Sequence, residues 1–389
     1  MPPVDEERKG QGREVKLDGA VGYHHGRFPP ATLDFARLIG PLRRAATAIG
    51  RYDAMLGTLH NKELLLAPLR HQEAVVSSRI EGTVATLDEV LTLEASEDDG
   101  GDGAQGKQAP RPEALEVRAY TRALRYAQRA MADEHLPICG RLIREAHRHM
   151  LFSGRGGDKR PGEFRNGQNY ISDGQSGKIR FVPIEAPHLE AGFKAFEEYV
   201  NDATVEPLIQ TAVSHAEFES LHPFDDGNGR IGRMIVTLNL WNKGLIGGPH
   251  FYVSSRIEAR RDEYIDRLRA VSADDAWTEW CVFFLDVLEA QANENLEIAT
   301  SIAALYEEMK GIFADRLHSR WAMQALDTIF AKPLFWNAAF TAHGGIPKQT
   351  AARFTKLLAE AGLLATVIPA SGRRSALYAF EPLLRLVRH

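Results

Sequence analysis

Residue types that can bind phosphate are concentrated in one short stretch, His222–Arg233, with the sequence HPFDDGNGRIGR. Gly227 and Gly229 have no side chains, so a ligand can approach their backbone closely. The apolar run that follows has helical character, and the free N–H groups at the start of a helix attract anions. If that helix begins just after Gly227, Arg230 and Arg233 project from neighbouring positions and offer guanidinium groups to phosphate oxygens. The stretch therefore predicts a phosphate-binding cradle.

Other side chains of this stretch predict a reactive site. Asp226 offers hard oxygen ligands beside the cradle, which suits Mg²⁺ held jointly by one carboxylate and substrate phosphates. His222 titrates near neutral pH and can accept a proton from an attacking hydroxyl group. Phe224 is expected to pack inward and fix the loop. These residues leave open which phosphorus atom is attacked, because the same cradle with Mg²⁺ also suits a kinase.

The stretch matches the pattern H-x-F-x-[DE]-G-N-G-R-x-x-R at all eight specified positions, and in this it resembles the Fic (filamentation induced by cAMP) family. The resemblance implies nucleotidyl transfer, most often of AMP from ATP to a protein hydroxyl, with diphosphate as the leaving group. It makes His222 the general base and Asp226 the Mg²⁺ ligand. It assigns phosphate contacts to the remaining motif residues, Gly227, Asn228, Gly229, Arg230 and Arg233.

A second, shorter motif lies far upstream, with Ser77, Glu81 and Gly82 in the arrangement [ST]-x-x-x-E-[GN]. Alone it indicates only a solvated helix face, because serine and glutamate four residues apart are common on helices. In a chain that resembles the Fic family, it matches the inhibitory motif, whose glutamate pairs with the second signature arginine, here Arg233. The resemblance is to the class with an N-terminal inhibitory helix, in which ATP binds only unproductively. Another Ser-Ser-Arg-Ile-Glu sequence ends at Glu258, but alanine follows it, so we do not assign it this role.

The composition is that of a globular protein of 389 residues, 44% of them hydrophobic, with a net charge of −5. No apolar run approaches the roughly 20 residues of a membrane-spanning helix, so we expect no membrane association. Residues 1–19 are charged and lack the apolar region of a secretory signal. The two cysteines lack metal-ligand spacing, which favours structural thiols in a reducing cytosol. A cytoplasmic location is therefore predicted.

The residue patterns predict a mainly α-helical fold. The resemblance implies a Fic-type helical bundle with a β-hairpin flap, to which a C-terminal winged-helix domain is added. Residues 94–110 are acidic, glycine-rich and without apolar content, so we expect a flexible linker, and residues 275–317 are expected to form a connecting pair of helices. The predicted parts are a disordered lead (1–20), an N-terminal helical region with the inhibitory helix and the linker (21–110), the Fic core with following helices (111–315) and the winged-helix domain (316–389).

Upstream of the signature, short β-type runs flank the turn-forming sequence DGQSG, which predicts a hairpin. In Fic-like enzymes such a hairpin lies over the active site and aligns the target backbone by strand pairing; a hairpin that only covers the surface is the alternative. Pro161–Arg165 also resembles the family, without a role for Arg165, and His147 is expected to be a surface or packing residue. The candidate docking residues are Ile179, Arg180, Phe181 and Val182.

From Ser319 to His389 the chain is basic, with nine Lys/Arg against three Asp/Glu, whereas the remainder is acidic. Its segments predict three helices and a hairpin, the order of a winged helix. A positive face of this kind fits DNA phosphates, although winged helices also serve as protein-docking modules. The basic residues expected on this face are Lys348, Arg353 and Lys356 of the recognition helix and Arg373 and Arg374 at the wing tip.

The main prediction is an adenylyltransferase that uses ATP and Mg²⁺, modifies a serine, threonine or tyrosine of a target protein, and is inhibited by Glu81. One alternative is removal of AMP, with Glu81 orienting a water molecule, and another is transfer of a different phosphate-containing group. A non-enzymatic alternative is a DNA-binding regulator whose core senses nucleotides. Self-modification and a homodimer are left open as well.

Overall fold

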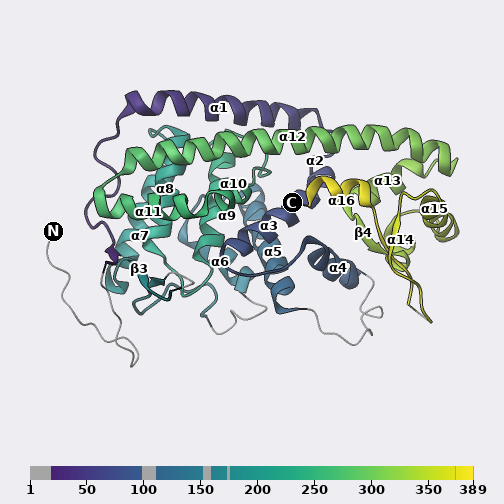
Figure 1. Ribbon diagram of the computed structural model, residues 1–389, viewed down its shortest axis with the longest axis horizontal. Coiled ribbons are helices and arrows are strands. Elements are labelled where there is room, and N and C mark those ends of the chain that lie inside the picture. The colour runs from purple at the N-terminus through teal and green to yellow at the C-terminus, as the bar shows by residue number, and fades with distance from the viewer. Residues whose placement is uncertain (1–18, 99–110, 152–158, 173–175, 373, 389) are drawn as a thin grey trace.

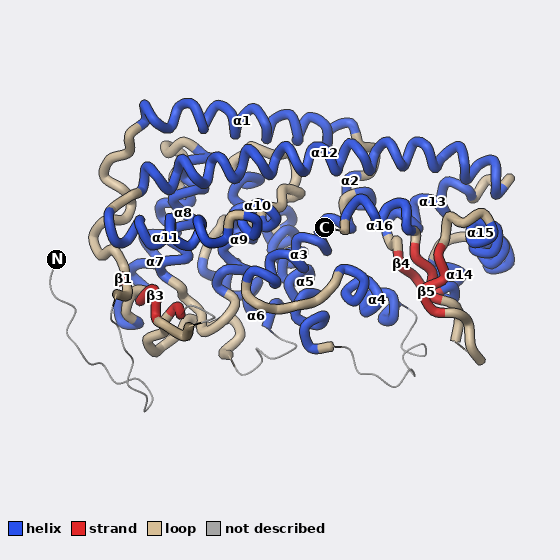
Figure 2. The backbone as a smooth tube through the Cα atoms, in the orientation of Figure 1, coloured by secondary structure: helices blue, strands red, loops and turns tan. Residues whose placement is uncertain are grey.

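The computed structural model is mainly helical, as predicted, and among the described residues it has two small three-stranded sheets (Figures 1 and 2). None of the described helices is both long and apolar enough to cross a lipid bilayer. The predicted lead, up to residue 18, and residues 99–110 of the predicted linker lie outside the described residues. The described residues are 19–98, 111–151, 159–172, 176–372 and 374–388.

Two long helices run along one side of the molecule (Figure 1). α1 (Phe35–Thr58) begins after Asp34, whose carboxylate accepts hydrogen bonds from two backbone N–H groups of the first turn. α12 (Trp277–Leu317) is a single helix of 41 residues, so the predicted pair of helices is wrong. The reason is that no proline interrupts this segment and its buried residues recur at helical spacing to the end, from Trp280 to Phe313. α12 thereby connects the core with the C-terminal part.

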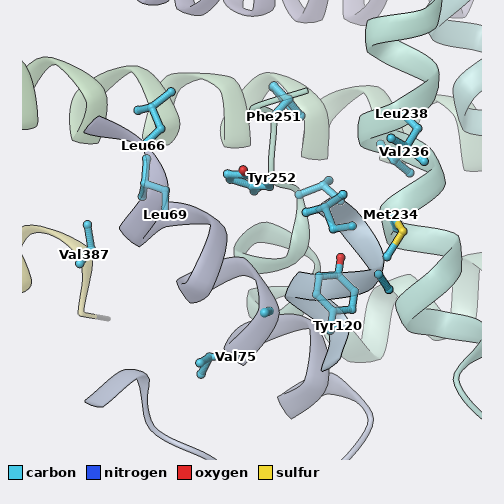
Figure 3. Close-up of a cluster of buried hydrophobic side chains, with 14 of the residues drawn as sticks. Leu66, Leu69, Val75, Tyr120, Met234, Val236, Leu238, Phe251, Tyr252 and Val387 are labelled. Carbon is cyan, nitrogen blue, oxygen red and sulfur yellow. The ribbon is translucent and has the colours of Figure 1, made fainter. Parts of the chain in front are cut away.

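The remaining helices of the core pack beneath α12. α8 and α9 are buried on nearly all sides, so polar residues such as His215 and Arg233 lie inside the core together with the apolar ones. Figure 3 shows side chains of α9, including Met234 and Leu238, in one buried cluster with Tyr120 and Phe251. These helices are α5 (Pro112–Asp133), α6 (Gly140–Leu151), α7 (Ala186–Asn201), α8 (Pro207–Leu221), α9 (Asn228–Asn242), α10 (Ser254–Ala259) and α11 (Arg261–Asp274).

The N-terminal region forms α2 (Lys62–Leu65), α3 (Ala67–Ile80) and α4 (Leu87–Asp98). Thr86 and Glu89 exchange side-chain and backbone hydrogen bonds of 2.8 and 3.2 Å, a capping box that starts α4. Residues 94–98 belong to this helix, which corrects the predicted start of the linker. The physical reason is tertiary packing, since Ala95 is buried and Glu94 pairs with His71 of α3.

The first sheet has the strand order β1-β3-β2, and the predicted hairpin is present in it. β2 (Ile171–Ser172) and β3 (Ile179–Val182) pair antiparallel, whereas β1 (Val21–Gly22) pairs parallel with the other side of β3. Phe181 therefore has strand partners on both sides. β1 therefore covers one edge of β3 at Phe181 and Val182, and the role of Ile179–Val182 in docking a target stays a prediction.

The residues after β1 hold it against the core. His24 is buried and its two ring nitrogens lie 2.8 Å from Glu217 Oε2 on α8 and from Ser272 Oγ on α11. The hydroxyl group of Tyr23 donates to the same carboxylate at 2.6 Å. This N-terminal segment is thus fixed to the helix that ends at the signature stretch.

The C-terminal part follows the order helix, strand, two helices, two strands and a final helix. The three predicted helices and the hairpin are present, and a strand within residues 334–336 that the sequence analysis did not predict completes the sheet β4-β6-β5. Assignment as a winged helix stays a prediction. The elements are α13 (Ala322–Ala331), β4 (Leu334–Trp336), α14 (Asn337–His343), α15 (Lys348–Glu360), β5 (Ala365–Ile368), β6 (Leu377–Ala379) and α16 (Glu381–Val387).

The three predicted basic residues of α15 are all exposed, and two of them also have partners within the chain. The guanidinium group of Arg353 donates to the Leu317 carbonyl at 3.0 Å, and Lys356 lies 3.8 Å from Glu360. Arg374 stacks over the Trp336 ring, with its guanidinium carbon 4.3 Å from the ring centre, and Arg373 lies outside the described residues. DNA binding stays a prediction.

The C-terminal part contacts α3, which carries the upstream Ser77–Gly82 motif at its end, and α4, which follows it. Arg388 donates to both carboxylate oxygens of Asp88 on α4 at 2.9 Å, and the Trp336 indole donates to Ser96 on α4 at 3.3 Å. α16 packs against α3, and Figure 3 shows Val387 near Leu69 at this end of α3. α3 and α4 are therefore held between the core helices and the C-terminal part.

Candidate active site

The signature stretch forms a tight connection between α8 and α9. His222 ends α8 with a left-handed backbone (φ 46°), and Gly227 (φ 81°) reverses the chain again just before α9. The side chain of Asn228 closes the loop, since its Oδ1 accepts from the Phe224 N–H and its Nδ2 donates to the Phe224 carbonyl, both at 2.8 Å. One Nδ2–H of Asn228 is thus used inside the loop, which leaves its second side-chain N–H and its backbone N–H for the predicted phosphate contact.

His222 is held in the form of a neutral base. Its Nδ1 lies 3.3 Å from the Glu219 carbonyl oxygen, which can only accept, so Nδ1 carries the hydrogen and Nε2 carries the lone pair. Burial lowers the pKa of His222 to about 4, although nearby carboxylates oppose the shift. At neutral pH the imidazole can therefore accept a proton.

Arg165, to which the sequence analysis assigned no role, organises the backbone around His222. Its guanidinium group donates to the carbonyls of His222 and Gly167 at 2.9 Å and of Leu221 at 3.2 Å, and also to that of Ile184. Burial lowers the pKa of Arg165 to about 10, but the group stays charged at neutral pH. The only sequence signal for this residue was its place in the family-like segment 161–165.

The start of α9 has the features of an anion site. Arg230 is buried, and its Nη2 lies 3.5 Å from Asp226 Oδ1. Its Nε and Nη1 atoms have no hydrogen-bond partner among the residues that the structure describes. Buried donors without partners are costly, so this site fits an anionic ligand. The carboxylate of Asp226 is 48% exposed beside it.

The predicted ion pair between Glu81 and Arg233 is present, with Nη2 and Oε1 2.8 Å apart. Ser77 completes the arrangement, because its hydroxyl accepts from Arg233 Nε at 3.0 Å and its carbonyl from Nη2 at 2.7 Å. Gly82 has a left-handed backbone (φ 87°) and allows the chain to turn directly after Glu81 ends α3. The three residues of the upstream motif thus meet the second signature arginine.

The carboxylate of Glu81 also lies against the start of α9. A Cβ atom on Gly229 would collide with this carboxylate, so the absence of a side chain at Gly229 is required for the contact. Burial acts to raise the pKa of Glu81, but Arg233 and Arg230 outweigh it, and the net pKa is lowered. An ionised carboxylate therefore occupies the place where an anionic ligand would meet α9.

Glu219 lies next to this pair and is not ionised at neutral pH. Its carboxyl group packs against Gly232, and its Oε1 has no hydrogen-bond partner within the described part of the chain. Burial raises the pKa of Glu219 to about 8, although Arg233 opposes the shift. The carboxyl group therefore stays protonated between the signature loop and Arg233.

We expect Glu219→Gln to reduce the loss of folding stability that the protein undergoes as the pH rises. The unfolded chain loses this proton near pH 4.5 and the folded protein near pH 8, so the wild type loses stability as the pH rises between these values. Glutamine stays neutral, and the free energy of unfolding of the variant relative to wild type should rise by on the order of 4 kcal/mol over this range. Urea unfolding at several pH values measures this difference, and a difference independent of pH would contradict it.

The hairpin is tied to the signature loop at its base. The side-chain amide of Asn169 donates to the carbonyls of Phe224 at 3.2 Å and His222 at 3.4 Å. Gln168 donates to the Pro183 carbonyl at 3.0 Å and so joins the two sides of the hairpin. The predicted flap therefore lies beside the candidate base.

Comparison with known proteins agrees with this arrangement. The family model for the Fic/DOC family matches residues 137–240, and that for the Fic/DOC family N-terminal region matches residues 39–129. The chain belongs to the Fic/DOC family. Its two matched regions contain the signature stretch and the upstream motif.

Curated relatives of this Fic/DOC protein are named as adenylyltransferases. It is 29% identical over 133 residues to "Protein adenylyltransferase fic-1" of Caenorhabditis elegans, a match that covers 33% of this chain and 24% of the relative. It is 29% identical over 152 residues to "Protein adenylyltransferase Fic" of Nematostella vectensis, covering 38% of this chain and 32% of the relative. The chain thus spans about a quarter to a third of the length of these relatives.

A crystal structure of a Fic family protein from Desulfovibrio desulfuricans shares the fold. It superimposes with a TM-score of 0.55 and 21% identity, and the match covers 90% of this chain and 98% of the other. The likeness therefore extends well beyond the two regions that the family models match.

Proposed function

We propose that this Fic/DOC protein transfers AMP from ATP to a serine, threonine or tyrosine hydroxyl of a target protein. The observation that carries the proposal is a neutral imidazole, His222, placed at one end of an anion site with unpartnered buried donors from Arg230. The names of the curated relatives support the choice of adenylyl transfer over other phosphate chemistry.

In the proposed reaction, Nε2 of His222 takes the proton of the target hydroxyl, whose oxygen attacks the α-phosphorus of ATP. The bond from this phosphorus to its bridging oxygen breaks, and diphosphate leaves with the electron pair. Backbone N–H groups from Gly227 to Gly229 and the guanidinium groups of Arg230 and Arg233 stabilise the charge on the phosphate oxygens. Arg165 holds the turn that carries the base.

Asp226 is the residue proposed to hold Mg²⁺. No cluster of three or more His, Cys, Asp or Glu side chains suited to a metal is found among the described residues, so the proposed ligands are this half-exposed carboxylate and phosphate oxygens of ATP. The distance of 3.5 Å between Asp226 Oδ1 and Arg230 Nη2 is long for an ion pair, so a bound cation could replace Arg230 as the partner of this carboxylate. When bound, the ion neutralises charge on the transferred phosphate.

We expect Asp226→Asn to raise the Mg²⁺ concentration for half-maximal AMP transfer by at least about tenfold, because a neutral amide is a weaker ligand. Rates measured over a Mg²⁺ titration test this. Asp225→Asn is the matched control, since Asp225 is the adjacent exposed carboxylate. Equal Mg²⁺ dependence in both variants would remove Asp226 from the proposed ligand set.

Inhibition by Glu81 is part of the proposal. Its carboxylate neutralises Arg233 and fills space at the start of α9. Glu81 would therefore have to move away, freeing Arg233 and this space, before ATP phosphates bind productively. Arg388 and Trp336 of the C-terminal part bind Asp88 and Ser96 of α4. The C-terminal part therefore also restrains the region that carries Glu81.

The proposed docking edge for the target is the outer edge of β2, Ile171–Ser172. In the described sheet β2 is an edge strand, whereas β3 is central, so an added strand would pair with β2. The hydrogen bond from Asn169 to the His222 carbonyl supports this placement, because it holds the start of β2 beside His222, the proposed general base.

The experiment that tests the function incubates Glu81→Gly protein and a cell lysate with ATP labelled on either the α- or the γ-phosphate. Transfer of the α-label to protein, with the mass gain of AMP, is the expected result. Transfer of only the γ-label would identify a kinase and overturn the proposal. Absence of both labels from all proteins would also count against it.

Removal of AMP is a second candidate, favoured by the position of Glu81. The charge of Glu81 acts to raise the pKa of His222, so this carboxylate lies near enough to the proposed base to orient a water molecule beside it. Wild-type protein given an AMP-modified target would then release AMP, and Glu81→Gly would not. Release by both proteins would exclude a role for Glu81 in removal.

A further inference from the structure

We infer that His147 is a positioning residue that fixes the backbone of Asp226, and through it the Asp226 carboxylate. The inference rests on the proposed function for its consequences in catalysis. Its geometric basis is independent of that function. His147 lies on α6, which ends 71 residues before the signature begins. From the sequence it was expected to be a surface or packing residue.

The side chain of His147 bridges two turns of the chain. Its Nδ1 lies 2.9 Å from the Gly162 backbone nitrogen, and its Nε2 lies 2.9 Å from the Asp226 carbonyl oxygen. The Gly162 N–H can only donate and the Asp226 carbonyl can only accept. The imidazole is therefore neutral, with the hydrogen on Nε2.

Packing fixes the plane of this ring. It stacks on Phe224 with ring centres 3.7 Å apart and an angle of 8° between the planes, and the side chain is fully buried. Phe224 is the inward-pointing aromatic residue of the signature loop. The His147 ring is held on its face by Phe224 and hydrogen-bonded at both nitrogens, so its orientation is fixed. The hydrogen bond from Nε2 then fixes the orientation of the Asp226 carbonyl.

α6 forms a close-fitting support for both turns. A Cβ atom on Gly162 would lie 3.0 Å from the Arg144 carbonyl oxygen, and one on Gly227 would collide with the end of the Met150 side chain. Both glycines have left-handed backbones that other residues rarely adopt. The signature loop and the Pro161–Arg165 segment are thus docked on the same helix, with His147 between them.

This arrangement assigns His147 a role in the transition state more than in ATP binding. The arginines and the amides of α9 bind phosphate whether or not Asp226 is well aligned, whereas charge neutralisation during transfer depends on its position. Loss of such an outer contact typically costs about 10–100-fold in activity. The reduction is therefore expected in kcat, with KM for ATP little changed.

The test compares three variants in the Glu81→Gly background. His147→Phe keeps a ring for stacking on Phe224 and loses both hydrogen bonds, whereas His147→Gln keeps a donor and an acceptor. His149→Phe is the control, because His149 lies on the same helix and contacts Tyr126 instead of the loop. We expect a 10–100-fold lower kcat for His147→Phe, substantial rescue by glutamine, and no loss in the control.

Two further measurements separate this inference from the proposed function. Nitrogen-15 spectra of wild-type protein, assigned with the glutamine variant, should show His147 as the neutral form protonated on Nε2. Hydrogen exchange of the peptide that spans residues 222–231 should be faster in His147→Phe than in His149→Phe. Failure of Glu81→Gly to transfer AMP would overturn the function and leave these two tests of the inference intact.

The inference is overturned by any of three results. These are a tautomer with the hydrogen on Nδ1 in place of Nε2, a kcat for His147→Phe equal to that of the control, and no difference between phenylalanine and glutamine at position 147. If His147→Phe does not fold, the spectra of the wild type and the kinetics of His147→Gln decide the question.

Discussion

Replacing His222 with alanine is expected to lower the rate of AMP transfer by about 10²–10⁴-fold, the usual contribution of a general base. The physical reason is that Nε2 is the acceptor for the hydroxyl proton, and alanine offers none. Among the described residues, this side chain makes one hydrogen bond, from Nδ1 to the Glu219 carbonyl, so the fold should be retained without it. The variant is made in the Glu81→Gly background, and transfer is followed by the mass of the modified protein.

Retention of the fold is checked by circular dichroism and thermal unfolding of the double variant. ATP binding should persist, because the proposed phosphate contacts come from α9 and not from the imidazole. Full activity of His222→Ala in a folded protein would exclude the proposed mechanism. Because burial lowers the pKa of His222 to about 4, the base should also stay active down to about pH 5.

Replacing Glu81 with glycine is expected to increase AMP transfer by on the order of 10²-fold, because one preorganised donor to the developing charge contributes about this much. The substitution releases Arg233 and empties the start of α9. Initial rates with saturating ATP and Mg²⁺ measure the gain. The matched control is Glu258→Gly, which lies in an identical Ser-Ser-Arg-Ile-Glu sequence but lies 3.4 Å from Arg79 instead.

The same substitution is expected to destabilise the protein without ligand by about 1–2 kcal/mol. Arg233 is 1% exposed and keeps Ser77 as its partner, but it loses a carboxylate that is 36% exposed, so solvent reduces the cost below that of a fully buried pair. ATP should then raise the melting temperature of Glu81→Gly more than that of wild type. Equal rates and equal shifts in variant and wild type would mean that Glu81 does not compete with ATP.

The contact between the C-terminal part and α4 bears on the proposed inhibition by Glu81. Asp88 and Ser96 of α4 are bound by Arg388 and Trp336, which lie far along the chain. α4 follows the inhibitory turn after only the short segment 81–86. A change in the C-terminal part would therefore reach Glu81 through one helix and one turn.

The sequence by itself determined the features that depend on neighbouring residues. The signature loop is built from local contacts, such as those of Asn228 with Phe224 four residues away, so its composition alone predicted an anion site at a helix start. Helical spacing and turn-forming residues likewise predicted the helical class and the hairpin. The pair of Glu81 with Arg233, 152 residues apart, was accessible only through the resemblance to a family.

Only the tertiary structure decided which distant residues complete the site. Arg165 and His147 act on backbone carbonyls, and a carbonyl is the same in every residue, so no pattern in the sequence marks these partners. The pairing of β1 with β3 depends on residues about 160 positions apart, and it covers one edge of β3 at Phe181 and Val182. The helix at residues 94–98 forms because packing of Ala95 offsets the entropy that an isolated acidic segment would keep.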